Sequence, residues 1–136
     1  MRGAYQFGLH SIRVEEDIVL LKYVGGASPE EFERQNAIFA EFGEHMTRMY
    51  LLIDLSEAGL SNPNSRKYAA ENSSGRVPLA TICFGASMLI RTAALMVTGA
   101  ARILGRSKAD MQFVATEDEA RARVTSLRAA PVPNKA

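Results

Sequence analysis

The sequence predicts a single α/β domain with a mixed, mainly parallel five-stranded sheet flanked by helices. Short apolar runs of strand length alternate along the chain with longer segments whose apolar residues recur at helical spacing. Each helical segment follows a residue type that caps helices. Strands that alternate with helices build a parallel sheet with right-handed crossovers, so this pattern predicts the class.

The N-terminal part is expected to form an antiparallel pair of strands. Residues 5–15 alternate apolar and polar side chains, but the alternation slips near His10, which indicates a bulge or an edge strand. Residues 18–24 are nearly all apolar, as expected of a central strand. Because only residues 16–17 separate the two strands, they are predicted to form a hairpin.

The rest of the chain continues the alternation. Ser28 and Glu31 predict a capping box for a first helix that begins at Pro29 and ends near Gly43. The further elements expected are a strand over Met49–Leu55, a turn over Ser56–Ser61, a short helix capped by Asn62 with Pro63 first, a strand over Leu79–Phe84, a long helix over Met88–Leu104, a strand over Met111–Ala115 and a last helix with a capping box formed by Thr116 and Glu119. Residues 1–130 then make one domain, and residues 131–136 are expected to be a flexible tail.

The amino-acid composition limits the classes of function that are expected. The 136 residues are 47% hydrophobic and 23% charged with a net charge of +1, which is typical of a globular domain and favours no binding of nucleic acid. A single cysteine and an N-terminus without a signal-peptide pattern favour a cytoplasmic location. Residues 86–104 resemble a membrane span in hydropathy, but Arg91 and Arg102 favour a helix of a soluble domain over an integral span.

Three segments carry a family resemblance. Residues 51–56 (LLIDLS) form an apolar strand that ends in Asp-Leu-Ser, residues 79–91 join a strand to a long helix through a glycine, and residues 113–120 (FVATEDEA) join a strand to the last helix. In this order they resemble the STAS, or SpoIIAA-like, domains of anti-sigma-factor antagonists, and a subgroup of small bacterial proteins of unassigned function. The resemblance covers nearly the whole chain. It implies the order β-β-α-β-α-β-α-β-α and a non-catalytic interaction or regulatory module.

The family's phosphorylation switch is altered here. In switchable STAS proteins a serine at the start of the second helix is phosphorylated, within the pattern Asp-Ser-Ser/Thr-Gly. The corresponding stretch is Ser61-Asn62-Pro63-Asn64-Ser65, which lacks the aspartate and the glycine. This departure argues against the switch, although a helix N-terminus would favour a phosphate on Ser61 or Ser65.

Several residues are candidates for contacting a ligand or partner. Asp54 is expected at the end of a strand, where α/β sheets bind ligands, or else it caps a nearby turn. Gly85 and Ser87 would let backbone N–H groups approach an anion, or else form only a tight turn. Arg91 and Arg66 could add positive charge there. Residues 58–108 hold seven basic residues and one acid, which indicates either a basic surface or complementation of the acidic residues 14–57 within the fold.

The long helix suggests two functions. Its apolar arc is about twice the width that covering one sheet face requires. Neighbouring helices, a second copy of the chain through Met88–Leu104, or a lipid could cover the excess. The first hypothesis is a self-associating module that binds itself or another protein. The alternative is a carrier of an apolar or amphiphilic anionic ligand, as in the CRAL-TRIO-like lipid-binding proteins with which the subgroup is compared.

No enzyme, cofactor or metal site is expected. The two histidines, His10 and His45, are far apart in sequence, and no nucleotide-binding or hydrolase motif is present. Cys83 lies within an apolar run, as an inert cysteine does. An enzyme would require Asp54 to meet His45 or Ser87 in the fold.

Overall fold

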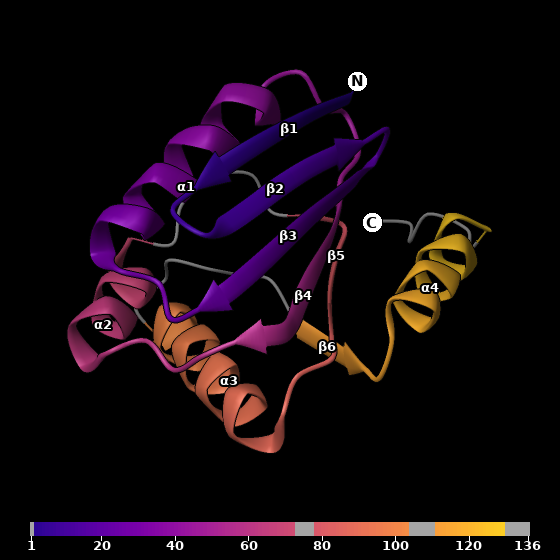
Figure 1. Ribbon diagram of the computed structural model, residues 1–136. Coiled ribbons are helices and arrows are strands. Elements are labelled where there is room, and N and C mark those ends of the chain that lie inside the picture. The colour runs from indigo at the N-terminus through magenta and orange to yellow at the C-terminus, as the bar shows by residue number, and fades with distance from the viewer. Residues whose placement is uncertain (1, 73–77, 104–110, 130–136) are drawn as a thin grey trace.

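The computed structural model describes residues 2–72, 78–103 and 111–129, which form one mixed sheet and four helices (Figure 1). The elements are β1 (Arg2–Phe7), β2 (His10–Glu15), β3 (Ile18–Gly25), α1 (Pro29–Gly43), β4 (Tyr50–Ala58), α2 (Pro63–Glu71), β5 (Ala80–Phe84), α3 (Met88–Ile103), β6 (Met111–Val114) and α4 (Glu117–Ala129). The predicted tail, residues 131–136, and the predicted last residue of the long helix, Leu104, lie outside the described residues.

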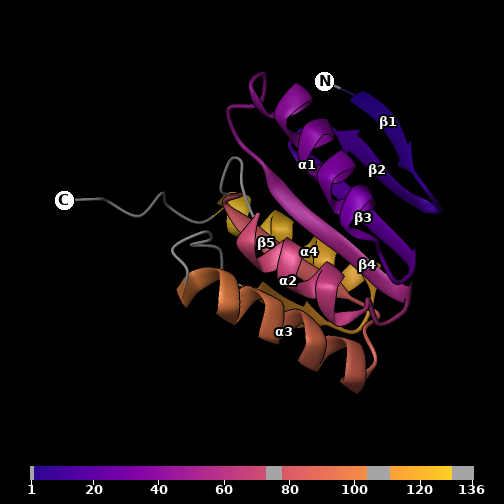
Figure 2. The same cartoon turned by 90° about the vertical axis from the view of Figure 1, so that its left-hand side faces the viewer.

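The six strands are arranged in the sheet in their order along the chain. β1, β2 and β3 pair antiparallel, and β3, β4, β5 and β6 pair parallel. Each parallel step is made by a helix, and right-handed crossovers that add strands in one direction place these helices on the same face. α1, α2 and α3 accordingly cover one face of the sheet, and α4 covers the other (Figures 1 and 2).

Two hydrophobic clusters follow from these layers. One lies under α1–α3 and includes Phe42, Ile53 and Cys83. The other lies under α4 and includes Leu52 and Val124. Strand alternation separates Leu52 from Ile53, because successive side chains point to opposite faces of a sheet. From Tyr50 to Leu55 the apolar residues of β4 accordingly alternate between the two clusters.

The predicted single strand over residues 5–15 is wrong, and this adds a sixth strand. Residues 2–15 form a hairpin in which Phe7 pairs with His10 across the two residues Gly8 and Leu9. Gly8 has a φ of +64°, which suits the first central position of a two-residue hairpin turn. The slip in alternation near His10 thus marks the exit from a turn and not a bulge.

The predicted capping of α1 and α2 is confirmed. The Glu31 N–H donates to Ser28 Oγ (3.1 Å), and the Ser28 N–H donates to the Glu31 carboxylate (2.9 Å), which completes the capping box. Asn62 caps α2, where its Oδ1 accepts the Ser65 N–H at 2.8 Å. These bonds satisfy N–H groups that the first turn of a helix otherwise leaves without partners.

The capping box predicted for α4 forms only in part. Thr116 Oγ1 accepts the Glu119 N–H at 3.2 Å, but the Glu119 carboxylate accepts the Ala115 N–H and not that of Thr116. Ala120 and Val124 are buried against the sheet. Two arginines join α4 to the segment around the second hairpin turn: Arg121 pairs with Glu15 and Arg128 with Asp17.

No helix among the described residues is long and apolar enough to span a membrane.

Candidate functional site

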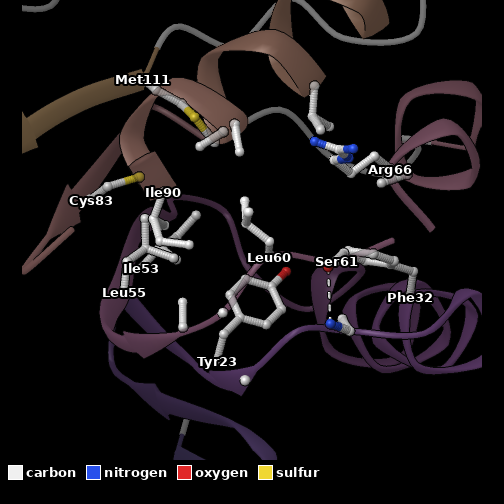
Figure 3. Close-up of a pocket in the computed structure, with 18 residues that line it drawn as sticks. Tyr23, Phe32, Ile53, Leu55, Leu60, Ser61, Arg66, Cys83, Ile90 and Met111 are labelled. Atoms are coloured by element: carbon white, nitrogen blue, oxygen red, sulfur yellow. Dashed lines mark hydrogen bonds between the residues drawn. The ribbon is translucent and has the colours of Figure 1, made fainter. Parts of the chain in front are cut away.

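A pocket of about 160 Å³ lies between the sheet and the helices α1–α3 (Figure 3). Its lining is largely apolar, and it opens near the carboxyl ends of β3 and β4, where Gly25 and the loop from Ala58 to Ser61 contribute. Apolar side chains in its wall include Phe32, Ile53, Leu55, Leu60, Ile90 and Val97. The pocket thus lies at the edge where α/β sheets usually bind ligands.

The packing of α3 explains why this space exists. The helix turns small side chains, Ala93 and Ala94, toward the pocket. Several of its large side chains point away from the sheet: Met88 is 79% exposed and Met96 is 64% exposed. A helix normally buries its largest apolar side chains, and small ones leave the layer beneath them unfilled.

The polar groups at this site have different roles. Ser61 Oγ accepts the Ala27 N–H at 3.0 Å and so joins the α2 loop to the chain before α1. The Tyr23 hydroxyl donates to Gln35 Oε1 at 2.5 Å. Burial raises the pKa of Tyr23, so its hydroxyl stays protonated and remains a donor. Ser61 and Tyr23 therefore brace the wall of the pocket.

Arg66 differs from the other arginines around the sheet. It is half-buried on α2, and its guanidinium points toward the pocket (Figure 3). It has no hydrogen-bond or ion-pair partner among the residues that the structure describes. Arg13, Arg121 and Arg128, by contrast, all pair with carboxylates. A cation partly withdrawn from water without a counter-ion is unfavourable, so this position attracts an anion.

The predicted residues around the start of α2 do come together. Ser61 and Arg66 line the pocket, and Asn62 caps the helix beside it. Ser65 is fully buried, and its Oγ has no hydrogen-bond partner in the described part of the chain. A buried serine is closed to a kinase unless α2 moves.

Gly85, Ser87 and Arg91 lie at the start of α3 but have other partners. Gly85 has a φ of +74°, and a Cβ added there would lie 3.0 Å from the Cβ of Ser56. Ser87 Oγ accepts the Ile90 N–H at 3.2 Å and so caps α3. The Arg91 guanidinium lies over the ring of Phe113, 4.9 Å from its centroid. These contacts give all three residues structural roles at the start of α3.

Asp54 is not at a strand end, which corrects the prediction. β4 continues to Ala58, because its pairing with β3 extends past the irregularity between Lys22 and Val24. Asp54 shares its parity with Leu52, so it lies on the α4 face, opposite the pocket. Its Oδ1 accepts the N–H (2.9 Å) and the Oγ–H (2.6 Å) of Ser56. The carboxylate thus caps local backbone.

Two buried groups near the pocket were not predicted as parts of a site. Cys83 lies in the pocket wall, and burial raises the pKa of its thiol to about 12. His10 is 1% exposed and packs edge-to-face against Tyr23, with ring centroids 5.3 Å apart. The only sequence signal for His10 is the slip in strand alternation, which does not indicate its partners.

In comparisons with known proteins, no protein-family model and no curated protein sequence matches this chain. The functional argument therefore starts from the geometry of the pocket and of Arg66.

Proposed function

We propose that this chain is a non-catalytic binding module of SpoIIAA-like (STAS) fold whose pocket holds a small amphiphilic anion. One observation carries the proposal: the half-buried guanidinium of Arg66, which has no side-chain partner among the described residues, points toward a largely apolar pocket (Figure 3). An apolar group in the pocket would be removed from water while an attached anion neutralises the arginine.

The fold part of the proposal has separate support. From β2 onward, the order of strands and helices is the one that the STAS resemblance implies. The family's phosphorylation switch has less support, because Ser65 is buried and Ser61 accepts a backbone hydrogen bond.

The pocket volume limits the ligand. An apolar cavity of roughly 150 Å³ is enough to hold benzene. A space of about 160 Å³ therefore suits a single ring or a short aliphatic chain. A carboxylate is the simplest anion that a guanidinium binds through two parallel hydrogen bonds. The ligand class is thus a small aromatic or short-chain carboxylic acid.

Titration calorimetry with hexanoate and benzoate, with hexanol as the uncharged probe, tests the proposal. We expect the acids to bind and Arg66→Leu to weaken them by roughly 10- to 100-fold, as expected for losing a charge-assisted hydrogen bond. Lys67→Leu is the matched control, because Lys67 is exposed and pairs with Glu71 on the same helix. Equal binding of hexanoate by wild type and Arg66→Leu, or no binding of any probe, would contradict the proposal.

A second candidate function is protein association through the outward face of α3. Its motivation is the exposure of four large apolar side chains there: Met88, Leu89, Leu95 and Met96. Exposed apolar surface of this kind is typical of interaction sites. Met96→Glu should then abolish association in light scattering, while Ala122→Glu on α4 should not. An unchanged mass for Met96→Glu would remove this candidate.

A further inference from the structure

β1 is an unprotected edge of the sheet. No described strand pairs with its outer side, and it lies at the rim with α1 beside it (Figure 1). Edge strands of monomers usually carry lysine, proline or a bulge that prevents pairing. The charge of β1 lies at its first residue, Arg2; residues 3–7 are Gly-Ala-Tyr-Gln-Phe, without charge or proline, and their register with β2 is regular.

The register identifies which backbone groups face outward. Phe7 and His10 flank a two-residue turn and so form a hydrogen-bonded pair, as do Tyr5 and Ile12 two residues away. By the same alternation, Ala4 and Gln6 direct their N–H and C=O groups away from β2. Tyr5 lies between these two residues, with its side chain against the cluster under α1.

A groove of about 200 Å³ runs beside this edge, between β1 and α1. It is lined by Tyr5, Gln6, Arg34, Ala37, Ile38 and Glu41. Arg34 and Glu41 each lie three and four residues from the adjacent pair Ala37 and Ile38, so the four α1 residues form a single stripe along the helix. The stripe has a base at one end, an acid at the other and alanine near its middle. Arg34 and Glu41 are exposed, and neither has an ion-pair partner among the described residues.

We propose that two copies of this chain associate antiparallel through β1, with a two-fold axis at Tyr5. Ala4 of each copy then pairs with Gln6 of the other. The outward N–H and C=O groups of these two residues hydrogen-bond to each other across the interface. The two Tyr5 side chains meet on the helix side as a cross-strand aromatic pair.

The charges on α1 indicate that a second copy of the chain binds at the edge strand β1. A two-fold axis makes the two α1 helices antiparallel and gives a self-complementary contact. With the axis between Ala37 and Ile38, Arg34 of each copy faces Glu41 of the other. The same axis can pass near Tyr5, because Tyr5 and Gln6 line the groove together with Ala37 and Ile38.

This surface is independent of the proposed ligand site. α1 and α3 lie at opposite sides of the helix layer, with α2 between them (Figure 2). Pairing through β1 leaves the pocket and the outward face of α3 free. The association therefore goes beyond the proposed function, and either could fail without the other.

Sedimentation equilibrium of the full chain tests the proposal. We expect the wild type to have twice the chain mass of 14.8 kDa. Arg34→Glu and Glu41→Arg should each weaken the dimer on the order of 10-fold, because each turns two attractive pairs into repulsive ones. The double variant Arg34→Glu/Glu41→Arg restores opposite charges and should recover the dimer. Ala4→Pro, which removes an outward N–H but no bond to β2, should give a monomer with an unchanged circular dichroism spectrum.

Three results would overturn the proposal. They are a monomeric wild type at high concentration, a dimer that neither single charge reversal weakens, and a double variant as weak as the single ones. Met96→Glu on α3 distinguishes this interface from the second candidate function above: pairing through β1 leaves the mass of that variant unchanged, which would remove the α3 candidate. Loss of the dimer in Met96→Glu alone is a fourth result that would overturn the proposal, because it would assign the interface to α3.

Discussion

The imidazole of His10 and the carboxylate of Glu31 join β2 to the first turn of α1, with His10 Nε2 lying 3.3 Å from Glu31 Oε2. The Val24 N–H donates to His10 Nδ1 at 3.0 Å, so Nδ1 is the acceptor and Nε2 carries the proton toward Glu31. Glu31 also accepts the Ser28 N–H of the capping box. The buried imidazole of His10 thus connects β2, β3 and α1 near the pocket.

Replacing His10 by leucine should destabilise the fold. The substitution leaves the partly buried Val24 N–H without its acceptor, and an unsatisfied buried group costs about 1–3 kcal/mol. His45→Leu is the matched control, because His45 is exposed, and surface changes usually stay within about 0.5 kcal/mol. Urea denaturation gives the free energy of unfolding of both variants. Equal stabilities of the two variants would show that the His10 contacts contribute nothing.

Stability should fall in acid. The Ser28 backbone N–H lowers the pKa of Glu31 below the ordinary 4.5, and the Arg128 hydrogen bond lowers the pKa of Asp17 below 3.8. Because folding favours the ionised forms, these groups stabilise the protein above the unfolded-state values, and the contribution is lost as pH falls through the lowered values. Unfolding free energies measured from pH 6 to pH 2.5 should decrease most below about pH 4.5. Glu31→Gln/Asp17→Asn should flatten that decrease.

Gly85→Ala should destabilise more than Gly43→Ala. Gly85 has a positive φ and little room beside Ser56, and a left-handed conformation costs a non-glycine residue roughly 1–2 kcal/mol. Gly43 has no atom within 4 Å of an added Cβ, and alanine there should be neutral or stabilise by about 0.4–1 kcal/mol. Thermal unfolding of the two variants makes the comparison. A harmless Gly85→Ala would contradict the assigned turn geometry.

The thiol of Cys83 should be unreactive in the native protein. Burial raises its pKa to about 12, so almost no thiolate is present at pH 8. Ellman's reagent should label the chain only after urea unfolding. Rapid labelling without urea would mean that α3 opens readily over the pocket wall.

Filling the pocket should abolish ligand binding without unfolding the protein. Ala94→Leu places a larger side chain from α3 into the space of about 160 Å³. We expect hexanoate binding to be lost. The free energy of unfolding should change by less than about 1.5 kcal/mol, because the added leucine atoms occupy a cavity that already exists. Ala122→Leu on the exposed side of α4 should change neither. Retained hexanoate binding by Ala94→Leu would place the ligand elsewhere.

The site could be predicted from the sequence only in part. Ser61 is a candidate through the phosphorylation stretch and Arg66 through its positive charge on the short helix, and both line the pocket. Tyr23 and Cys83 are not candidates, because a residue inside an apolar strand carries no local mark of the cavity beside it. Asp54 was expected at the same crevice, but the extension of β4 and the parity of its side chain place it on the other face.

Interactions within a few residues were determined by the sequence itself. The Ser28–Glu31 capping box, the Asn62 cap and the apolar excess of α3 are of this kind, because cap hydrogen bonds and helical periodicity involve neighbours along the chain. The tertiary structure alone decided which residues share a face. The hairpin at Gly8, the opposite faces of Asp54 and Arg66, and the meeting of His10 with Glu31 depend on strand pairing between distant segments, where a shift of one residue reverses every side chain.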